Sequence, residues 1–167
     1  TELQKFWKNH HYSTITTNID AALAAIKSSL FDVYLVNKIY PDRTKLTSYS
    51  INFNNALTAG SISCSPFYIP FSRPDTLYYI EDVNGLIKVF GITAGDFQTK
   101  EYEAGYFGTV NYTTGEVVIS QIQPTPAIHP IEWIVEAKVT DKDVDAKFNQ
   151  VLFLDESLST INVVTYT

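Results

Sequence analysis

The sequence predicts an α+β chain that is mainly β: an antiparallel, sandwich-like or barrel-like β domain with a short N-terminal helix. Three observations predict this class. Apolar residues follow a helical spacing only near the N-terminus. Beyond residue 32 the pattern alternates with a period of two, in about eight to ten short runs. Turn residues separate these runs at intervals of roughly 8–15 residues, which is typical of antiparallel β domains.

The helical pattern spans residues 17–30, so we expect residues 1–31 to form a helical lead-in and residues 32–167 to form the β domain. A short helix with a narrow apolar face is marginal alone in water and must pack against another surface. Pairing of two copies about a two-fold axis would bury this face twice, which favours a homodimer. The candidate self-association residues are Phe6, Trp7, Ile19, Leu23, Ile26 and Leu30.

Residues 33–40 and 47–53 are the first two predicted strands. In the second strand the odd-numbered residues point one way and small polar residues point the other, which predicts one buried face and one solvated face. Residues 65–75 contain three prolines. Because proline cannot donate a hydrogen bond to a neighbouring strand, this segment is predicted to be a loop or a sheet edge.

Asn84-Gly85 lies between two apolar runs, residues 76–80 and 86–90, and predicts a β-hairpin. A type I′ turn needs positive φ at both central residues, which Asn and Gly tolerate. Since Glu81 and Asp82 are also polar, we expect the connection to run a little longer than two residues.

Thr114-Gly115 predicts a second hairpin. In this hairpin Val110 and Tyr112 on one strand would pair with Val117 and Ile119 on the other.

The clearest amphipathic strand covers residues 131–139, where Ile131 and Trp133 begin the apolar face. Three prolines before it mark a crossing segment, and residues 151–154 and 161–166 are the last predicted strands.

Composition excludes several classes of protein. The formal net charge is −6 and the pI is about 4.9, which disfavours nucleic-acid binding because phosphate contacts need a basic patch. The sequence contains no apolar run long enough for a transmembrane helix and no visible signal peptide, so we expect no membrane partner. Met is absent, also at position 1, and we therefore expect the chain to be a piece of a longer polypeptide.

Motifs for nucleophilic or zinc chemistry are missing from the sequence. Cys64 has no nucleophile elbow around it, and as the single cysteine it cannot form an intrachain disulfide. This fits a reducing compartment. The histidines lack the ligand spacing of a zinc site and are predicted to be structural or superficial. They are His10, His11 and His129.

The carboxylates do not form a recognisable site either. Residues 141–145 carry three aspartates at the spacing of a calcium loop, but Ala146 and Leu152 replace the required Gly and Glu, so we expect a solvated acidic turn. Glu132 and Glu136 share a strand face, yet their backbones would be about 13 Å apart, beyond the separation of a glycosidase pair. We expect no catalytic residue, no metal and no cofactor.

Three stretches together form a recognisable ordered set. They are INFNNALTAGSISCSPF at 51–67, GTVNYTTGEVVI at 108–119, and FNQVLFLD at 148–155 with INV following at 161–163. In this order they resemble the C-terminal part of the large baseplate wedge proteins of T4-like contractile-tailed phages, distant relatives of baseplate J-like proteins. The resemblance spans roughly residues 32–164 and does not include the lead-in.

The resemblance implies a structural, non-enzymatic virion protein. Wedge subunits of this kind pair with themselves and with neighbouring wedge subunits to build a ring around the tail hub, and the family offers no catalytic residue to carry over. It implies assembly in the host cytoplasm and a final location in the tail baseplate. Two other functions stay open: a carbohydrate- or receptor-binding β-sandwich with a groove of exposed Tyr or Trp, and a small hydrolase.

Overall fold

The computed structural model describes Thr17, Ala21 and residues 32–141 without 74, 95–98 and 106. Within this part the chain is mainly β and its strands pair antiparallel, which confirms the predicted class at that level. Thr17 and Ala21 have helical backbone and are exposed, but the rest of the predicted helix lies outside the described residues. The predicted strands at 151–154 and 161–166 also lie outside them.

The described residues form two sheets. Their strands are β1 (Tyr34–Ile39), β2 (Thr47–Asn52), β3 (Ser63–Cys64), β4 (Phe67–Tyr68), β5 (Thr76–Val83), β6 (Leu86–Thr93), β7 (Glu101–Tyr102), β8 (Gly108–Asn111), β9 (Glu116–Ile122), β10 (Thr125–Pro126) and β11 (Trp133–Lys138).

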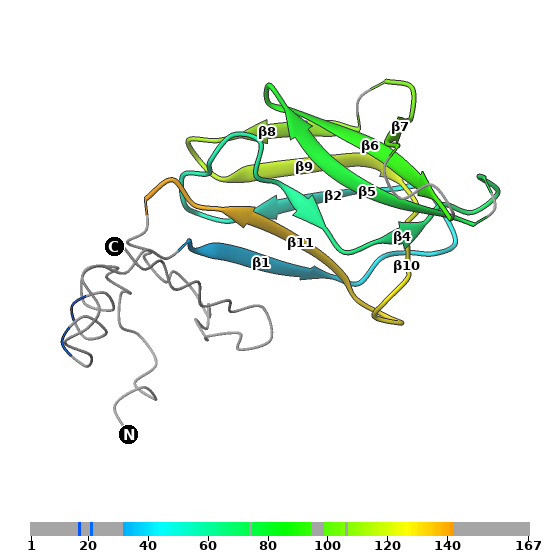
Figure 1. The fold of residues 1–167 in the computed structure, drawn as a ribbon, viewed down its shortest axis with the longest axis horizontal. Coiled ribbons are helices and arrows are strands. Elements are labelled where there is room, and N and C mark those ends of the chain that lie inside the picture. Colours follow the sequence, from blue (N-terminus) through cyan, green and yellow to red (C-terminus); the bar gives the residue numbers. More distant parts are fainter. Residues whose placement is uncertain are drawn as a thin grey trace, which may run out of the picture.

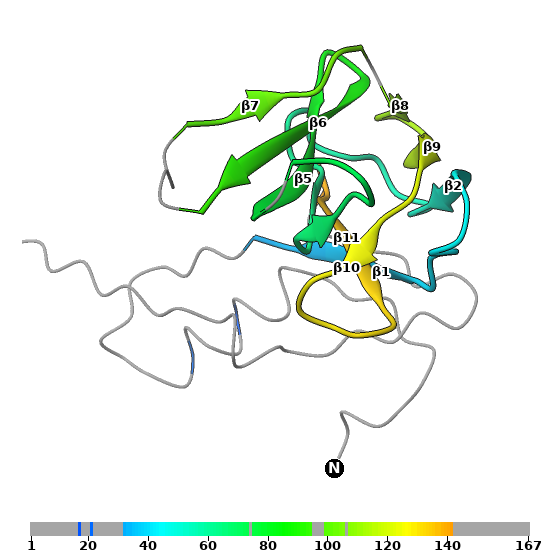
Figure 2. The same cartoon turned by 90° about the vertical axis from the view of Figure 1, so that its right-hand side faces the viewer.

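The larger sheet has the strand order β10-β4-β5-β6-β8-β9-β2, and β7 pairs with β6 beside this path. It curls into a half-barrel (Figures 1 and 2). The smaller sheet has the order β1-β11-β3 and lies along the open side of the half-barrel, with β1 at its outer edge (Figure 1). Buried residues of both sheets form one hydrophobic cluster, so the two sheets share a core.

Trp133 joins the two sheets. Its side chain is fully buried, and its ring meets Phe67 edge-on with centroids 5.2 Å apart and Tyr49 with centroids 6.0 Å apart. The indole N–H donates to the Ser65 carbonyl at 3.2 Å, which satisfies its polar atom inside the core. Trp133 thus fixes the smaller sheet against β2 and β4.

The first hairpin turns in two residues. Asn84 and Gly85 have φ values of 52° and 79°, as a type I′ turn requires. Strands β5 and β6 pair up to Val83 and Leu86, so the longer connection expected from the sequence is wrong. Asp82 lies inside β5 and is buried, because partners described below satisfy its carboxylate.

The second hairpin, β8–β9, turns in four residues. Val110 pairs with Val117 as expected, but Gly108 is the partner of Ile119, and Tyr112 lies in the turn. The predicted pairing of Tyr112 is wrong because residues 112–115 close the turn, with the Gly115 N–H donating to the Asn111 carbonyl at 2.9 Å.

The proline-rich segments pair with each other through very short strands. Most of the described residues in 65–75 are loop, as expected, but Phe67–Tyr68 form β4, which lies between β10 and β5 and not at an edge. It is only two residues long and is flanked by Pro66 and Pro70, which restricts its pairing to those residues. Pro126 lies in the edge strand β10.

Ile131 does not belong to the last described strand. The ladder with β1 begins at Trp133, and Ile131 is 62% exposed, so its predicted place on the buried face is wrong. Pro130 precedes it and offers no amide to a ladder, so the chain bends here before it enters β11.

Candidate functional site

The outer edge of β1 is the first candidate site. The Val139 N–H donates to the Val33 carbonyl at 3.2 Å, and the register pairs Val33's neighbour Tyr34 with Lys138. Since backbone groups alternate in direction along an antiparallel strand, the odd-numbered residues of β1 bond to β11. The amide and carbonyl groups of Tyr34, Val36 and Lys38 therefore face away from β11. Within the described residues β1 has a strand neighbour on that one side only.

The same even-numbered positions carry exposed side chains. Tyr34, Val36 and Tyr40 are 51%, 52% and 67% exposed, and Lys38 lies between them. We call Tyr34, Val36, Lys38 and Tyr40 the β1 edge surface. It combines outward-facing backbone with apolar and aromatic side chains.

Charges next to this surface are neutralised within the molecule. Lys38 Nζ lies 2.9 Å from Glu132 Oε2, and the Tyr40 hydroxyl donates to the same carboxylate at 3.2 Å. The hydrogen bond between Lys38 and Glu132 lowers the pKa of Glu132, and the same bond raises the pKa of Lys38. Lys138 Nζ lies 2.9 Å from Asp32. The exposed apolar side chains are therefore not surrounded by an excess of one charge.

The other described edges are shorter or irregular. β3 and β10 have two residues each, and β10 ends in Pro126. β2 has six residues, but its register shifts between Thr47 and Tyr49, and its exposed side chains are Ser48, Ser50 and Asn52. Bulges, short length, proline and charged side chains such as Lys are the usual means by which proteins block pairing at an edge, and in β1 the charge of Lys38 is paired with Glu132. Among the described strands, β1 combines length, regular register and apolar side chains at an edge.

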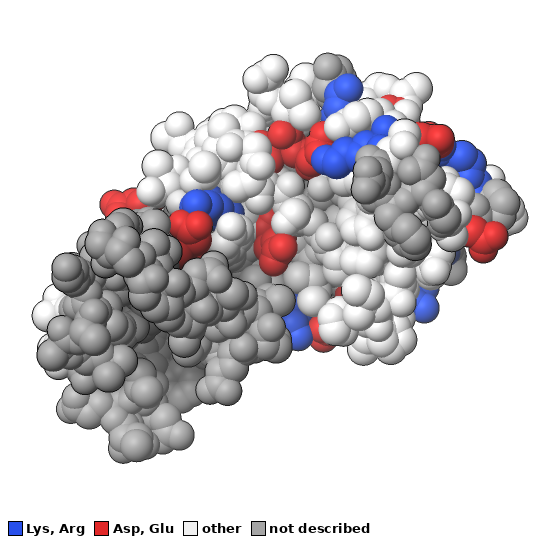
Figure 3. Space-filling model, viewed as in Figure 1, with Lys and Arg blue, Asp and Glu red and all other residues white. Residues whose placement is uncertain are grey.

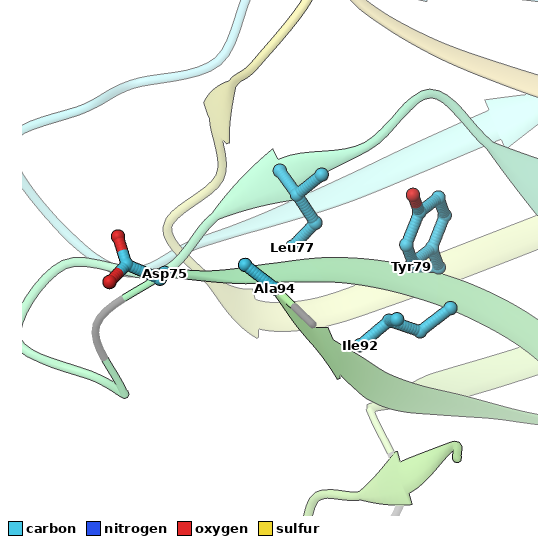
Figure 4. Close-up of a pocket in the computed structure, with 5 residues that line it drawn as sticks. All are labelled: Asp75, Leu77, Tyr79, Ile92 and Ala94. Carbon is cyan, nitrogen blue, oxygen red and sulfur yellow. The ribbon is translucent and has the colours of Figure 1, made fainter. Parts of the chain in front are cut away.

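A shallow hollow on the outer face of the β5–β6 hairpin is the second candidate. It has a volume of about 320 Å³ and is lined by Asp75, Leu77, Tyr79, Ile92 and Ala94 (Figure 4). The Tyr79 ring stacks on Phe90 with centroids 5.5 Å apart. One aromatic ring and one carboxylate accompany three aliphatic side chains, so the lining is mainly apolar.

Charged groups beside the hollow are engaged with one another. Lys100 Nζ lies 2.6 Å from Glu81 and 4.3 Å from the centroid of the Phe90 ring, and the Tyr102 hydroxyl donates to Glu81 at 2.6 Å. Burial raises the pKa of Glu81, but these hydrogen bonds outweigh it and leave the pKa lowered. Figure 3 shows acidic and basic side chains adjoining one another on the upper part of this face. These contacts join β5, β6 and β7 at the surface beside the hollow.

Asp82 is a buried carboxylate with a structural role. It is 5% exposed and accepts hydrogen bonds from the amides of Gly60 and Ile62, both at 2.7 Å, and from the Tyr112 hydroxyl at 2.6 Å. Burial, followed by the bond to Asp82, raises the pKa of Tyr112. The carboxylate thus ties the loop before β3 to β5 and to the second hairpin.

Cys64 lies in β3 and is half-buried. Burial raises the pKa of its thiol to about 12, and the Ile80 N–H donates to Sγ at 3.3 Å. Because the thiolate is the reactive form, this cysteine is a poor nucleophile at neutral pH.

The remaining candidates from the sequence are not brought together. Glu132 pairs with Lys38, whereas Glu136 accepts from Ser63 at 2.9 Å, so the two carboxylates serve separate contacts. His129 is exposed in the loop before β11. In the part of the chain that the structure describes, no three His, Cys, Asp or Glu side chains are grouped to hold a metal ion, and no helix is long and apolar enough to cross a membrane.

The predicted self-association surface of the lead-in lies outside the described residues, as do the first two histidines and two of the loop aspartates. These residues are Phe6, Trp7, His10, His11, Ile19, Leu23, Ile26, Leu30, Asp143 and Asp145.

Sequence reasoning predicted the strand that contains the β1 edge surface but not that it lies at an edge. The available signal was the placement of Asn37 and Lys38 inside an otherwise apolar run, which is unusual for a strand buried on both faces. The comparisons add no relative: no protein-family model, no curated protein and no solved structure matches the chain.

Proposed function

We propose that this chain is a structural assembly module that acts through protein–protein contacts, as a wedge or ring subunit of a contractile-tail baseplate. The observation that carries the proposal is the β1 edge surface, which exposes apolar side chains and, among the described residues, has no strand neighbour on its outer side. Such edges are places where another chain can add a strand. The resemblance of the three ordered stretches to baseplate wedge proteins supplies the context.

A ring subunit needs at least two contact surfaces. A two-fold contact is fully occupied once two subunits have formed a dimer. Growth into a ring therefore requires a second, different contact. The apolar face of the lead-in, residues 17–30 with Phe6 and Trp7, is our proposal for one self-association surface. Neighbouring wedge subunits would be the other partners, and the assembled protein would reside in the virion.

Antibody labelling of particles from the source of the chain tests the location. We expect electron microscopy to show the label at the tail baseplate. Label confined to the soluble fraction, or spread over the capsid, would contradict the baseplate role.

Light scattering tests the lead-in contact. The double variant Leu23→Asp, Ile26→Asp should lower the mass of the full chain, whereas the matched variant Ala21→Asp, at an exposed position, should not. A monomeric parent, or a double variant of unchanged mass, would contradict self-association through the lead-in.

The second candidate function is carbohydrate or receptor binding, favoured by the hollow that holds Tyr79 and Asp75. Aromatic faces with a nearby carboxylate suit sugar rings, which offer C–H groups and hydroxyls. A glycan array with the full chain, and with Tyr79→Ala as the control, tests it. Binding that depends on Tyr79 would support this function, and an array without hits would eliminate its carbohydrate form.

A further inference from the structure

We propose that the β1 edge surface binds β1 of a second copy, antiparallel and about a two-fold axis at Val36. The two three-stranded sheets would then form one continuous sheet across the dimer. This inference rests on the proposed function and deepens it, because it names the partner of the β1 edge surface and the register of the contact.

Backbone geometry supports a contact centred on Val36. The outward-facing groups belong to Tyr34, Val36 and Lys38, as the register with β11 requires. A two-fold axis at Val36 places Val36 opposite itself and Tyr34 opposite Lys38 of the second copy. Each of these pairs has its amide and carbonyl aimed at the partner strand, so each can exchange both hydrogen bonds.

The side chains agree with the same register. The two Val36 side chains meet at the axis, where like residues must be tolerated, and an apolar pair is favourable there. On either side an ammonium of Lys38 faces a Tyr34 ring, an arrangement that stabilises by cation–π attraction. One step further out, Tyr40 lies opposite Asp32, and each keeps its own partner, Glu132 and Lys138, so neither introduces an unpaired charge.

Another axis position fits less well. An axis at Lys38 would place two Lys38–Glu132 ion pairs opposite each other, so that no apolar pair forms at the axis. An axis at Asn37 would bring Lys38 against Val36 of the partner, so that Val36 loses its apolar partner and Lys38 its aromatic partner.

A second copy is the occupant that this self-complementary pattern favours. The edge carries apolar, cationic and aromatic positions that match themselves when the strand direction is reversed. The equivalent surface of β2 has a bulge and small polar side chains, so it does not compete for the same partner.

Disulfide trapping in the full chain tests the register. Cα atoms of a hydrogen-bonded antiparallel pair lie about 5.5 Å apart, which a disulfide can span. Val36→Cys should form a covalent dimer under mild oxidation at low micromolar concentration. Tyr34→Cys alone and Lys38→Cys alone should stay monomeric on a non-reducing gel, but an equal mixture of the two should cross-link.

Ser50→Cys on β2 is the matched control, since Ser50 is also an exposed, outward-facing position in the middle of a six-residue edge strand. It should give no covalent dimer, and it also reports any reaction of Cys64. Failure of Val36→Cys to cross-link, or equal cross-linking of Ser50→Cys, would overturn the proposal. Occupation of the edge by a strand of a different protein, or by a segment of the same chain outside the described residues, would give that negative result as well.

A backbone variant tests the contact without an added thiol. The Val36 N–H faces away from β11, so Val36→Pro removes a donor from the proposed interface and none from the molecule's own sheet. With Leu23→Asp and Ile26→Asp also in place to remove the proposed lead-in contact, we expect sedimentation equilibrium to show at least a roughly 100-fold weaker dimer, equivalent to about 2.7 kcal/mol. Ser50→Pro should leave the dimer unchanged, and circular dichroism should confirm that both variants fold. An unchanged dimer in folded Val36→Pro would contradict the proposal.

The two proposals fail in distinguishable ways. Baseplate labelling without trapping of Val36→Cys would leave the assembly role in place and remove the β1 contact. Trapping without baseplate labelling would keep the dimer and remove the baseplate role.

Discussion

The two six-residue edge strands, β1 and β2, have the same backbone arrangement and opposite surfaces. In β1 the residues that face outward are Tyr34, Val36 and Lys38. In β2 the Phe53 N–H donates to the Gly115 carbonyl at 2.9 Å, so the odd-numbered residues bond inward there too. The positions that face outward in β2 are Ser48, Ser50 and Asn52, which are exposed.

Side chains decide which of these edges is protected. In β2 the Ser48 hydroxyl accepts from the Gln121 N–H at 3.3 Å, and the Asn52 side chain accepts from the Asn54 N–H at 2.8 Å. These polar groups bond to the molecule's own backbone, and the bulge disturbs the register. The β1 edge surface has neither device. An edge strand can therefore pair with another chain when its register is regular and when its exposed apolar side chains become buried by the pairing.

The largest expected effect removes the support that both edges share. Trp133 lies beside Ile39 of β1 in the ladder and touches Tyr49 of β2. Trp133→Ala should lower the free energy of unfolding by about 3–5 kcal/mol, measured by urea denaturation. Trp133→Phe, which keeps an aromatic ring, should lose less. Loss of exchange protection at one edge alone would contradict a shared core.

A somewhat smaller effect should fall on the sheet that carries β1. Asp82→Ala leaves the amides of Gly60 and Ile62 and the Tyr112 hydroxyl without their acceptor, which should lower stability by on the order of 3 kcal/mol. Tyr112→Phe removes a single donor and should cost about 1 kcal/mol. Because the loop that Asp82 holds leads directly into β3 of the smaller sheet, hydrogen exchange should increase more at β1 than at β2. Equal increases would show that Asp82 does not favour that sheet.

Alkaline pH should lower the free energy of unfolding, because Cys64 in β3 has a raised pKa. The pKa of Cys64 is about 12 in the fold and about 8.5 in an unfolded chain. The unfolded state therefore releases its proton first, and stability is full below about pH 8.5 and falls as pH rises toward 12. At pH 10 the loss should be about 1–2 kcal/mol by urea unfolding. Cys64→Ala should flatten this part of the profile, whereas Tyr112, whose pKa is also raised, should add a later decline.

The smallest expected effect comes from changing β2 toward β1. Ser50→Val should alter stability by no more than about 0.5 kcal/mol, because the position is exposed. The mass in solution should also stay unchanged, since the bulge between Thr47 and Tyr49 still blocks regular pairing. The reverse change, Val36→Ser, should weaken the dimer. Association of Ser50→Val through β2 would show that side chains alone, without the bulge, decide the comparison.

The local sequence pattern predicts where most of the strands lie, but it does not predict which strands pair with each other. Alternation identified the stretches around β1, β2 and β11, and Asn84-Gly85 identified the first hairpin, since both signals act over a few residues. The status of β1 as an edge depends on strand order, which joins β1 to β11 across about a hundred residues of chain. No local pattern encodes such a pairing.

The buried polar contacts could not be predicted from the local sequence pattern either. The local pattern predicts Asp82 to lie in a polar connection, because it carries no information about Gly60, Ile62 and Tyr112, the partners that distant segments supply. The hollow beside Tyr79 likewise needs the folded hairpin to exist. The resemblance therefore supplies a functional proposal, and the structure supplies a surface on which that proposal can be tested.

Concentration-dependent hydrogen exchange compares the two edges most directly. The amides of Tyr34, Val36 and Lys38 should exchange slowly in a concentrated sample and at least about tenfold faster after dilution below the dissociation constant, because only a paired edge is protected. The amide of Ser50 should exchange at the same rate in both samples. Equal behaviour of β1 and β2 on dilution would contradict the account.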